Sequence, residues 1–136
     1  METTEKNTVS AVIRQEAYRT ELSALGHHLI ADEPEDNGGK NLGFGPGYFV
    51  RAGLASCTAI TLRMYANRKN YSVEEIHVDV FTEEVDGKTI FHREIKIKGN
   101  LDDGERARLL QIANKCPVHK MLSNPIEIES ELVMTN

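Results

Sequence analysis

Residues 48–66 read YFVRAGLASCTAITLRMYA, and this stretch decides the fold. Its apolar side chains run nearly all the way round a helical wheel. The interruptions are Arg51, Ser56, Thr58, Thr61 and Arg63. A helix that is apolar on every side is normally a buried one. The stretch therefore predicts a long central helix that more than one sheet, or a second subunit, covers, and the expected C-terminal stop is Asn70.

Short strands are predicted on the N-terminal side of this helix. Apolar and polar residues alternate from Val9 through Ile13, and Leu22 continues the pattern, which favours two strands. We expect a turn near Gly26 and a third strand over residues 28–31. The stretch 32–46 is rich in Gly, Pro, Asn and Asp, so it predicts a loop, which is either a mobile linker or an ordered wall over a site.

The segment after the central helix predicts a β-hairpin whose register can be read from the sequence. Asp86-Gly87 is a strong signal for a two-residue turn. With this turn, apolar residues face apolar ones and acidic or histidine residues face lysines, which supports the register. The predicted facing pairs are Ile76 with Ile97, Val78 with Ile95, Glu75 with Lys98, and His77 with Lys96.

Two further helices and a last strand complete the expected fold. Asp102 is a good N-cap for a helix that runs to Ala113. Cys116 precedes a proline, so it should lie at the start of a short helix over residues 117–122. The alternation over residues 126–132 predicts a final strand. The fold class is therefore α+β, with antiparallel sheet packed on a long helix and a second helix, in a single domain of 136 residues.

Composition excludes several classes of function. The net charge is −5, from 16 basic and 21 acidic residues, whereas a nucleic-acid-binding domain usually carries a basic surplus. No segment approaches the roughly 20 apolar residues of a membrane span, and the N-terminus lacks the apolar stretch of a signal peptide. We therefore expect a cytoplasmic protein with no nucleic-acid or membrane partner.

Cys116 has the clearer local chemistry of the two cysteines. A thiol at a helix N-terminus faces unpaired backbone N–H groups, and these favour the thiolate. Lys115, His119 and Lys120 add nearby positive charge. The alternative is an inert, buried cysteine that ends a helix.

Cys57 and the histidines have simpler interpretations from the residues alone. Cys57 lies in the middle of the apolar helix, where a free cysteine usually packs as a small hydrophobe. The histidines show no spacing with Cys or Asp that matches a zinc motif, so we expect no metal and no cofactor.

Two motifs carry a resemblance to a known family. The run GLASCT around Cys57, which follows Gly45-Pro46 and leads to Arg63-Met-Tyr-Ala66, resembles the central-helix signature of the OsmC and organic hydroperoxide resistance family. The run KCPVHK around Cys116 resembles the second cysteine motif of that family. The resemblance covers nearly the whole chain and points to the OsmC-like branch.

The resemblance implies a fold, an activity and a set of residues. It implies an intertwined homodimer that reduces organic hydroperoxides in oxidative stress defence and is recycled by an external dithiol. Cys57 would attack the peroxide and form a sulfenic acid, and Cys116 would condense with it to a disulfide. The arginine that activates the thiolate would be Arg19, or else Arg14. The expected substrate-binding residues are Leu54, Ile60, Met64 and Tyr48.

One departure from the family pattern keeps a second function open. Peroxidases of this family carry a glutamate close after the proline that begins the central helix, whereas this chain has Gly47 and Tyr48 there. The alternative is a non-peroxidatic protein that binds a small electrophile or a lipid-like ligand in an apolar pocket. A structural disulfide between Cys57 and Cys116 is disfavoured in a reducing cytosol.

Overall fold

The computed structural model describes residues 5–135 of the chain, which forms two compact units, Met1–Ala52 and Gly53–Asn136. The first unit contains a 3-10 helix η1 (Glu5–Asn7), strands β1 (Ser10–Ile13), β2 (Thr20–Ala24) and β3 (His27–Ala31), and a second 3-10 helix η2 (Glu35–Asn37). Helix α1 (Pro46–Lys69) begins in the first unit and continues into the second. There follow β4 (Ser72–Val85), β5 (Lys88–Asn100), α2 (Asp103–Ala113) and α3 (Pro117–Ser123). The expectation of a single domain stays a prediction.

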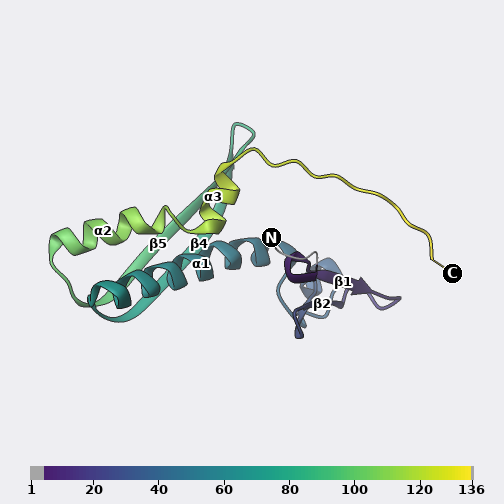
Figure 1. The fold of residues 1–136 in the computed structure, drawn as a ribbon. Coiled ribbons are helices and arrows are strands. Elements are labelled where there is room, and N and C mark those ends of the chain that lie inside the picture. The colour runs from purple at the N-terminus through teal and green to yellow at the C-terminus, as the bar shows by residue number, and fades with distance from the viewer. Residues whose placement is uncertain (1–4, 136) are drawn as a thin grey trace. The chain divides into compact units, whose positions relative to one another are not determined.

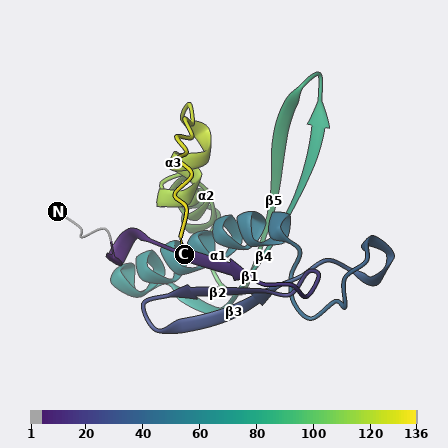
Figure 2. The ribbon, with the colours of Figure 1, turned by 90° about the vertical axis from the view of Figure 1, so that its right-hand side faces the viewer.

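The three predicted N-terminal strands form one antiparallel sheet in the order β1-β2-β3, which Figure 2 shows side by side. The turn between β2 and β3 falls at Leu25 and Gly26, whose φ angles are 50° and 82°. Glycine adopts positive φ without steric cost, so the sequence places it where the tight turn needs it. The strands and the turn near Gly26 are confirmed.

The loop after β3 is ordered around the side chain of Asp32. This residue is 2% exposed, and its carboxylate accepts hydrogen bonds from the backbone N–H groups of Glu33, Lys40 and Leu42, at 2.8, 3.3 and 3.1 Å. Burial opposes its ionisation, but these backbone donors outweigh burial and hold the pKa of Asp32 below its usual value. One carboxylate therefore holds three backbone groups of the loop in a defined arrangement, which favours the ordered alternative over the mobile linker.

The second unit contains the long hairpin in the predicted register. Ile76 pairs with Ile97, Val78 with Ile95, Glu75 with Lys98, and His77 with Lys96. The turn is at Asp86 and Gly87, with φ angles of 51° and 76°, as expected of a two-residue hairpin turn. Toward the start of β4 the register shifts by one residue, at a β-bulge between Val73 and Glu75. All the predicted facing pairs lie between this bulge and the turn, and they are confirmed.

Helices α1 and α2 pack against one face of this hairpin, as Figure 1 shows. The buried cluster is formed by Leu62, Tyr65, Leu109, Ile112 and Ala113, and the half-buried residues around it are Tyr71, Ile76, Ile95, Ile97 and Leu101. These side chains recur at helical spacing on α1 and α2 and at every second position on β5. The observed architecture, two antiparallel sheets with three α-helices in residues 5–135, confirms the α+β class.

Within one chain, α1 is covered on one face and not on all sides as predicted. Its buried residues are Leu54, Thr58, Leu62, Tyr65 and Ala66. Ile60 and Met64 are 54% and 68% exposed. The hairpin and α2 together cover only one side of the helix. The apolar residues on its other side leave room for the second subunit that the sequence favours, and that subunit stays a prediction.

The ends of the last two helices follow the sequence, but the last strand does not form. Asp102 caps α2, because it accepts from the Glu105 backbone N–H at 2.7 Å while the Glu105 carboxylate accepts from the Asp102 N–H at 3.1 Å. Residues 124–135 contain no strand and are exposed. The predicted strand over 126–132 is therefore wrong for this single chain, because no neighbouring strand supplies hydrogen-bond partners for its backbone.

Candidate active site

The fold brings the two cysteines together in the second unit. Cys57 lies in the middle of α1, and Cys116 is the N-cap residue of α3, followed by Pro117 at the first helical position. The two thiols are close enough for a hydrogen bond that links their ionisation. Both cysteines are free, Cys57 being half-buried and Cys116 completely buried. The two motifs that are 59 positions apart in sequence thus build one site.

The surroundings of Cys116 favour its thiolate. Its sulfur accepts the backbone N–H of His119 at 3.3 Å. Burial opposes ionisation, but the hydrogen bond from the Cys57 thiol and the backbone N–H groups of His119 and Val118 outweigh it, so the pKa of Cys116 lies below the ordinary thiol value. The expectation that Cys116 sits at a helix N-terminus is confirmed.

Cys57 is shifted in the opposite direction. Burial raises the pKa of the Cys57 thiol, and the hydrogen bond to Cys116 raises it further. In the resting dithiol the proton therefore favours Cys57, and the negative charge favours Cys116. Because the two ionisations influence each other, the charge state of each sulfur depends on that of the other.

Arg93 on β5 is a cation of the second unit that interacts electrostatically with both thiols. Its guanidinium donates to the Thr58 hydroxyl at 3.1 Å, to the Ala113 carbonyl at 3.3 Å and to the Asn114 side-chain oxygen at 2.9 Å. Burial lowers the pKa of Arg93, while the charges of Cys116 and Cys57 act to raise it. All three of these hydrogen-bond partners are neutral, so the thiols are the anions to which Arg93 couples.

Sequence reasoning missed Arg93, although the hairpin register contains a signal for it. Ile95 and Ile97 face the core, and Arg93 lies on the same face of β5, opposite Val80. A charged residue at an inward position of an otherwise apolar strand face requires a buried polar partner. Thr58, also missed, supplies it: this fully buried hydroxyl donates to the Leu54 carbonyl at 2.7 Å and accepts from Arg93.

An apolar cleft of about 670 Å³ opens on Cys57. Ile60 and Met64 line it, together with Ile112 from α2 and Val118 from α3. The expected role of Ile60 and Met64 in substrate binding stays a prediction. Lys115 and Arg68 also lie at the cleft. The sulfur that a ligand in this cleft meets is that of Cys57.

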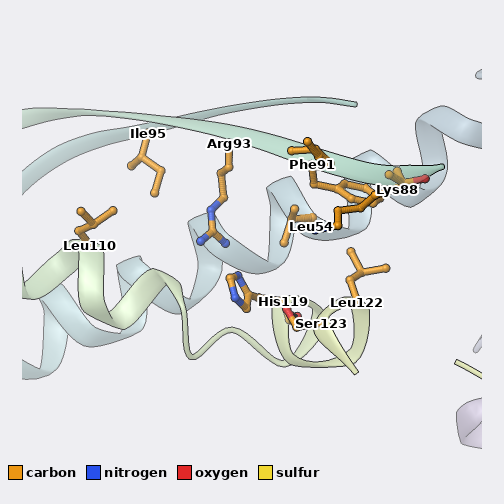
Figure 3. Close-up of a pocket in the computed structure, with 11 residues that line it drawn as sticks. Leu54, Lys88, Phe91, Arg93, Ile95, Leu110, His119, Leu122 and Ser123 are labelled. Carbon is orange, nitrogen blue, oxygen red and sulfur yellow. Dashed lines mark hydrogen bonds between the residues drawn. The ribbon is translucent and has the colours of Figure 1, made fainter. Parts of the chain in front are cut away.

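A second cleft of about 500 Å³ adjoins Arg93 and His119, and Figure 3 shows the residues that line it. Leu54, expected to bind substrate, lines this second cleft and not the one at Cys57. Burial and the charge of Arg93 lower the pKa of His119, which favours its neutral form. The arginine and the histidine point toward one another in Figure 3.

The other predicted site residues belong to the first unit. Arg14 and Arg19 both pair with Glu21, at 2.6 and 3.3 Å. The ring of Tyr48 lies in the first turn of α1, with the Arg51 guanidinium 4.3 Å from its centroid. The roles of Arg19 as the activating arginine and of Tyr48 as a substrate contact stay predictions.

Metal and membrane chemistry find no support in residues 5–135. No group of three or more His, Cys, Asp or Glu side chains in this range is arranged to hold a metal ion. No helix in the same range is long and apolar enough to cross a bilayer.

The candidate site is thus a pair of free thiols in an α+β unit, one on the central helix and one at a helix N-cap. The sequence model of the family described as OsmC-like protein matches residues 38–131, and this chain belongs to that family. No curated protein matches the chain closely enough to count as a relative.

Solved structures share the fold. A protein of Psychrobacter arcticus, described as an osmotic stress induced and detoxification response protein, is 25% identical, with a TM-score of 0.71 over 84% of this chain and 86% of its own. Organic hydroperoxide resistance proteins of Legionella pneumophila and Bacillus subtilis are 22% and 20% identical, with TM-scores of 0.59 and 0.57. Each pairing covers 85% of this chain and 89% of the other. The last two likenesses establish the fold, and the family resemblance in the sequence is confirmed.

Proposed function

We propose that this protein reduces organic hydroperoxides with Cys57 and Cys116 as a redox pair. The observation that carries the proposal is the asymmetry of the two thiols. Cys57 faces an apolar cleft of about 670 Å³, and Cys116 is buried behind it with the lowered pKa. The organic hydroperoxide resistance proteins that share the fold support this choice of substrate class.

The asymmetry supports a division of labour between the sulfurs. A hydroperoxide in the cleft meets Cys57, whose proton passes to the Cys116 thiolate along their hydrogen bond. The Cys57 sulfur then attacks the terminal peroxide oxygen, and the O–O bond breaks. The alkoxide leaves, takes the proton from the Cys116 thiol and becomes the alcohol. Cys57 is now a sulfenic acid and Cys116 is again a thiolate.

The second step closes the disulfide. The Cys116 thiolate attacks the Cys57 sulfur, the S–O bond breaks, and the hydroxide leaves into the solvent, where a proton from buffer acid converts it to water. The two electrons that reduced the peroxide come from the two sulfurs. An external dithiol returns them by thiol–disulfide exchange and is itself oxidised to a disulfide. The reaction requires neither a metal nor a cofactor.

Arg93 acts in this scheme as a positioning residue and a fixed positive charge. It couples to both thiols, and Thr58, Ala113 and Asn114 hold its guanidinium in place. A nearby cation favours the thiolate over the thiol. Arg93 supplies this charge within the second unit, whereas the resemblance assigns the role to Arg19.

The test is a peroxide-consumption assay with a dithiol reductant in excess. We expect cumene hydroperoxide to be consumed faster than hydrogen peroxide, because the cleft that opens on Cys57 is apolar. Cys57→Ser should abolish consumption, since a serine hydroxyl does not attack the O–O bond. Thr61→Ser is a matched control that keeps Cys57 and removes only a methyl group from the same cleft.

The same assay tests the alternative function. The first turn of α1 contains no acidic residue, unlike the family's peroxidases, and this favours a non-peroxidatic binding protein for small electrophiles or lipid-like ligands. Equal and negligible consumption by the wild type and Cys57→Ser would replace the peroxidase proposal with this one.

A further inference from the structure

We propose that the second cleft binds an amphiphile that bears a carboxylate, and that its affinity rises when Cys57 and Cys116 are oxidised to a disulfide. The cleft has a volume of about 500 Å³, enough for a small amphiphile, and it lies within the second unit. The carboxylate site does not depend on the proposed peroxidase function. The redox dependence does rest on the dithiol chemistry of that function.

One part of the cleft is suited to an anion. Arg93 and His119 line it, and in Figure 3 the guanidinium of Arg93 and the imidazole of His119 lie close to one another, whereas Lys88 lies at the other end of the cleft, beside Phe91. The hydrogen bonds of Arg93 to Thr58, Ala113 and Asn114 use three of its five N–H groups and reach only neutral oxygens. A planar guanidinium with remaining donors is the side chain best matched to a carboxylate. The neutral imidazole adds a hydrogen-bond donor.

The rest of the cleft is suited to an alkyl chain. Leu54 from α1, Phe91 and Ile95 from β5, and Leu110 and Leu122 from α2 and α3 line it with carbon. Apolar walls combined with a few polar groups at one place are the usual composition of a small-molecule site. Together, the two regions select for a ligand with one charged group and one apolar tail.

The redox dependence follows from the charge that Arg93 experiences. In the reduced protein the thiolate shared by Cys116 and Cys57 is the anion to which Arg93 couples. A disulfide carries no charge, so oxidation removes that anion and leaves a half-buried guanidinium with neutral partners. A half-buried cation without a counter-charge attracts an anion more strongly than a compensated one. A carboxylate in the cleft supplies the missing charge.

The experiment measures octanoate binding by calorimetry at mildly alkaline pH, where the reduced protein holds its thiolate. The oxidised protein is prepared with diamide, which accepts the two electrons and the thiol protons, so no peroxide is involved. We expect octanoate to bind the oxidised protein about tenfold more tightly than the reduced one. Octanol, which has the same chain length and no charge, should bind weakly and equally to both.

Variants complete the test. Arg93→Gln should remove both the preference for octanoate over octanol and the redox difference. Cys57→Ser combined with Cys116→Ser removes the thiolate without a disulfide and should bind octanoate like the oxidised protein.

The contrary results are equally clear. Octanoate that binds no more tightly than octanol would overturn the carboxylate site. Equal octanoate affinity in the reduced, oxidised and doubly substituted proteins would overturn the redox dependence. No step of this experiment uses peroxide. If the protein binds octanoate with the expected redox dependence but consumes no hydroperoxide, only the proposed function is contradicted, and the binding proposal stands.

Discussion

Arg93 on β5 donates a hydrogen bond of 3.1 Å to the hydroxyl of Thr58 on α1, one residue after Cys57. This contact connects the hairpin to the helix that carries the cleft-facing thiol. It also fixes a positive charge that interacts electrostatically with both sulfurs. The position of the hairpin relative to α1 therefore affects both the stability of the second unit and the ionisation of the site.

The contact predicts a stability difference between two substitutions of Thr58. Thr58→Val keeps the side-chain shape but removes the hydroxyl, so Arg93 loses a buried acceptor, and we expect a loss of about 1–3 kcal/mol in the free energy of unfolding. Thr58→Ser keeps the hydroxyl and should lose less. Urea denaturation of both variants measures the difference, and equal losses would contradict an energetic role for the hydrogen bond.

Arg93 also predicts a shift in thiol ionisation. Arg93→Gln should raise the apparent pKa of the Cys116 thiol, because an opposite charge nearby stabilises the ionised form. Arg93→Lys should restore part of the effect. Ultraviolet absorbance of the thiolate as a function of pH measures it. An unchanged titration in Arg93→Gln would show that the guanidinium does not act on the sulfurs.

The two cysteines should fail in different ways when they are replaced one at a time. Cys116→Ser should allow the first turnover, accumulate sulfenic acid on Cys57 and then stall, since no neighbouring thiolate closes the disulfide. Trapping with dimedone and mass measurement of the intact chain detect this species. If instead Cys57→Ser accumulates a sulfenic acid on Cys116, the assignment of the attacking sulfur is reversed.

The exposed side of α1 predicts self-association. Ile60 and Met64 are more than half exposed in the single chain, and we expect a homodimer with an interface above the ~2,000 Å² that marks obligate pairs. Sedimentation at micromolar concentration should show the dimer, and Met64→Lys should shift it toward monomer. Leu25→Lys, at an exposed turn 65% open to solvent, is the control and should leave the mass unchanged. A monomeric wild type would refute the dimer.

The sequence predicted those parts of the fold that local rules govern. The Asp86-Gly87 turn fixed which residues of β4 and β5 face each other, and Asp102 capped α2 as expected. Both depend on residues a few positions apart. The strand over 126–132 failed because alternation alone cannot supply a neighbouring strand, and a strand needs one for its backbone hydrogen bonds.

For the candidate site, the sequence predicted the two cysteines but not the positive charge beside them, which belongs to Arg93. Two cysteine motifs pointed to one centre, and the fold confirms their proximity. Arg93 escaped because its partners are Thr58 and Asn114, which come from α1 and from the residue after α2. Only the folded structure shows that Arg93, Thr58 and Asn114 come into contact. The apolar face of β5 would have revealed it, since a charged residue there has no local explanation.

The carboxylate of Asp32 has a consequence for how the first unit responds to acid. The pKa of Asp32 is lowered in the folded state, so its contribution to stability is fully present above its unfolded pKa of about 4 and is lost as the pH falls through the lowered folded value. Protonation would remove the acceptor for the backbone N–H groups of Glu33, Lys40 and Leu42 at the same time. We therefore expect the segment 32–42 to lose its ordered conformation in strong acid, where its backbone amides should exchange hydrogen faster. Asp32→Asn should cause the same loss of order at neutral pH.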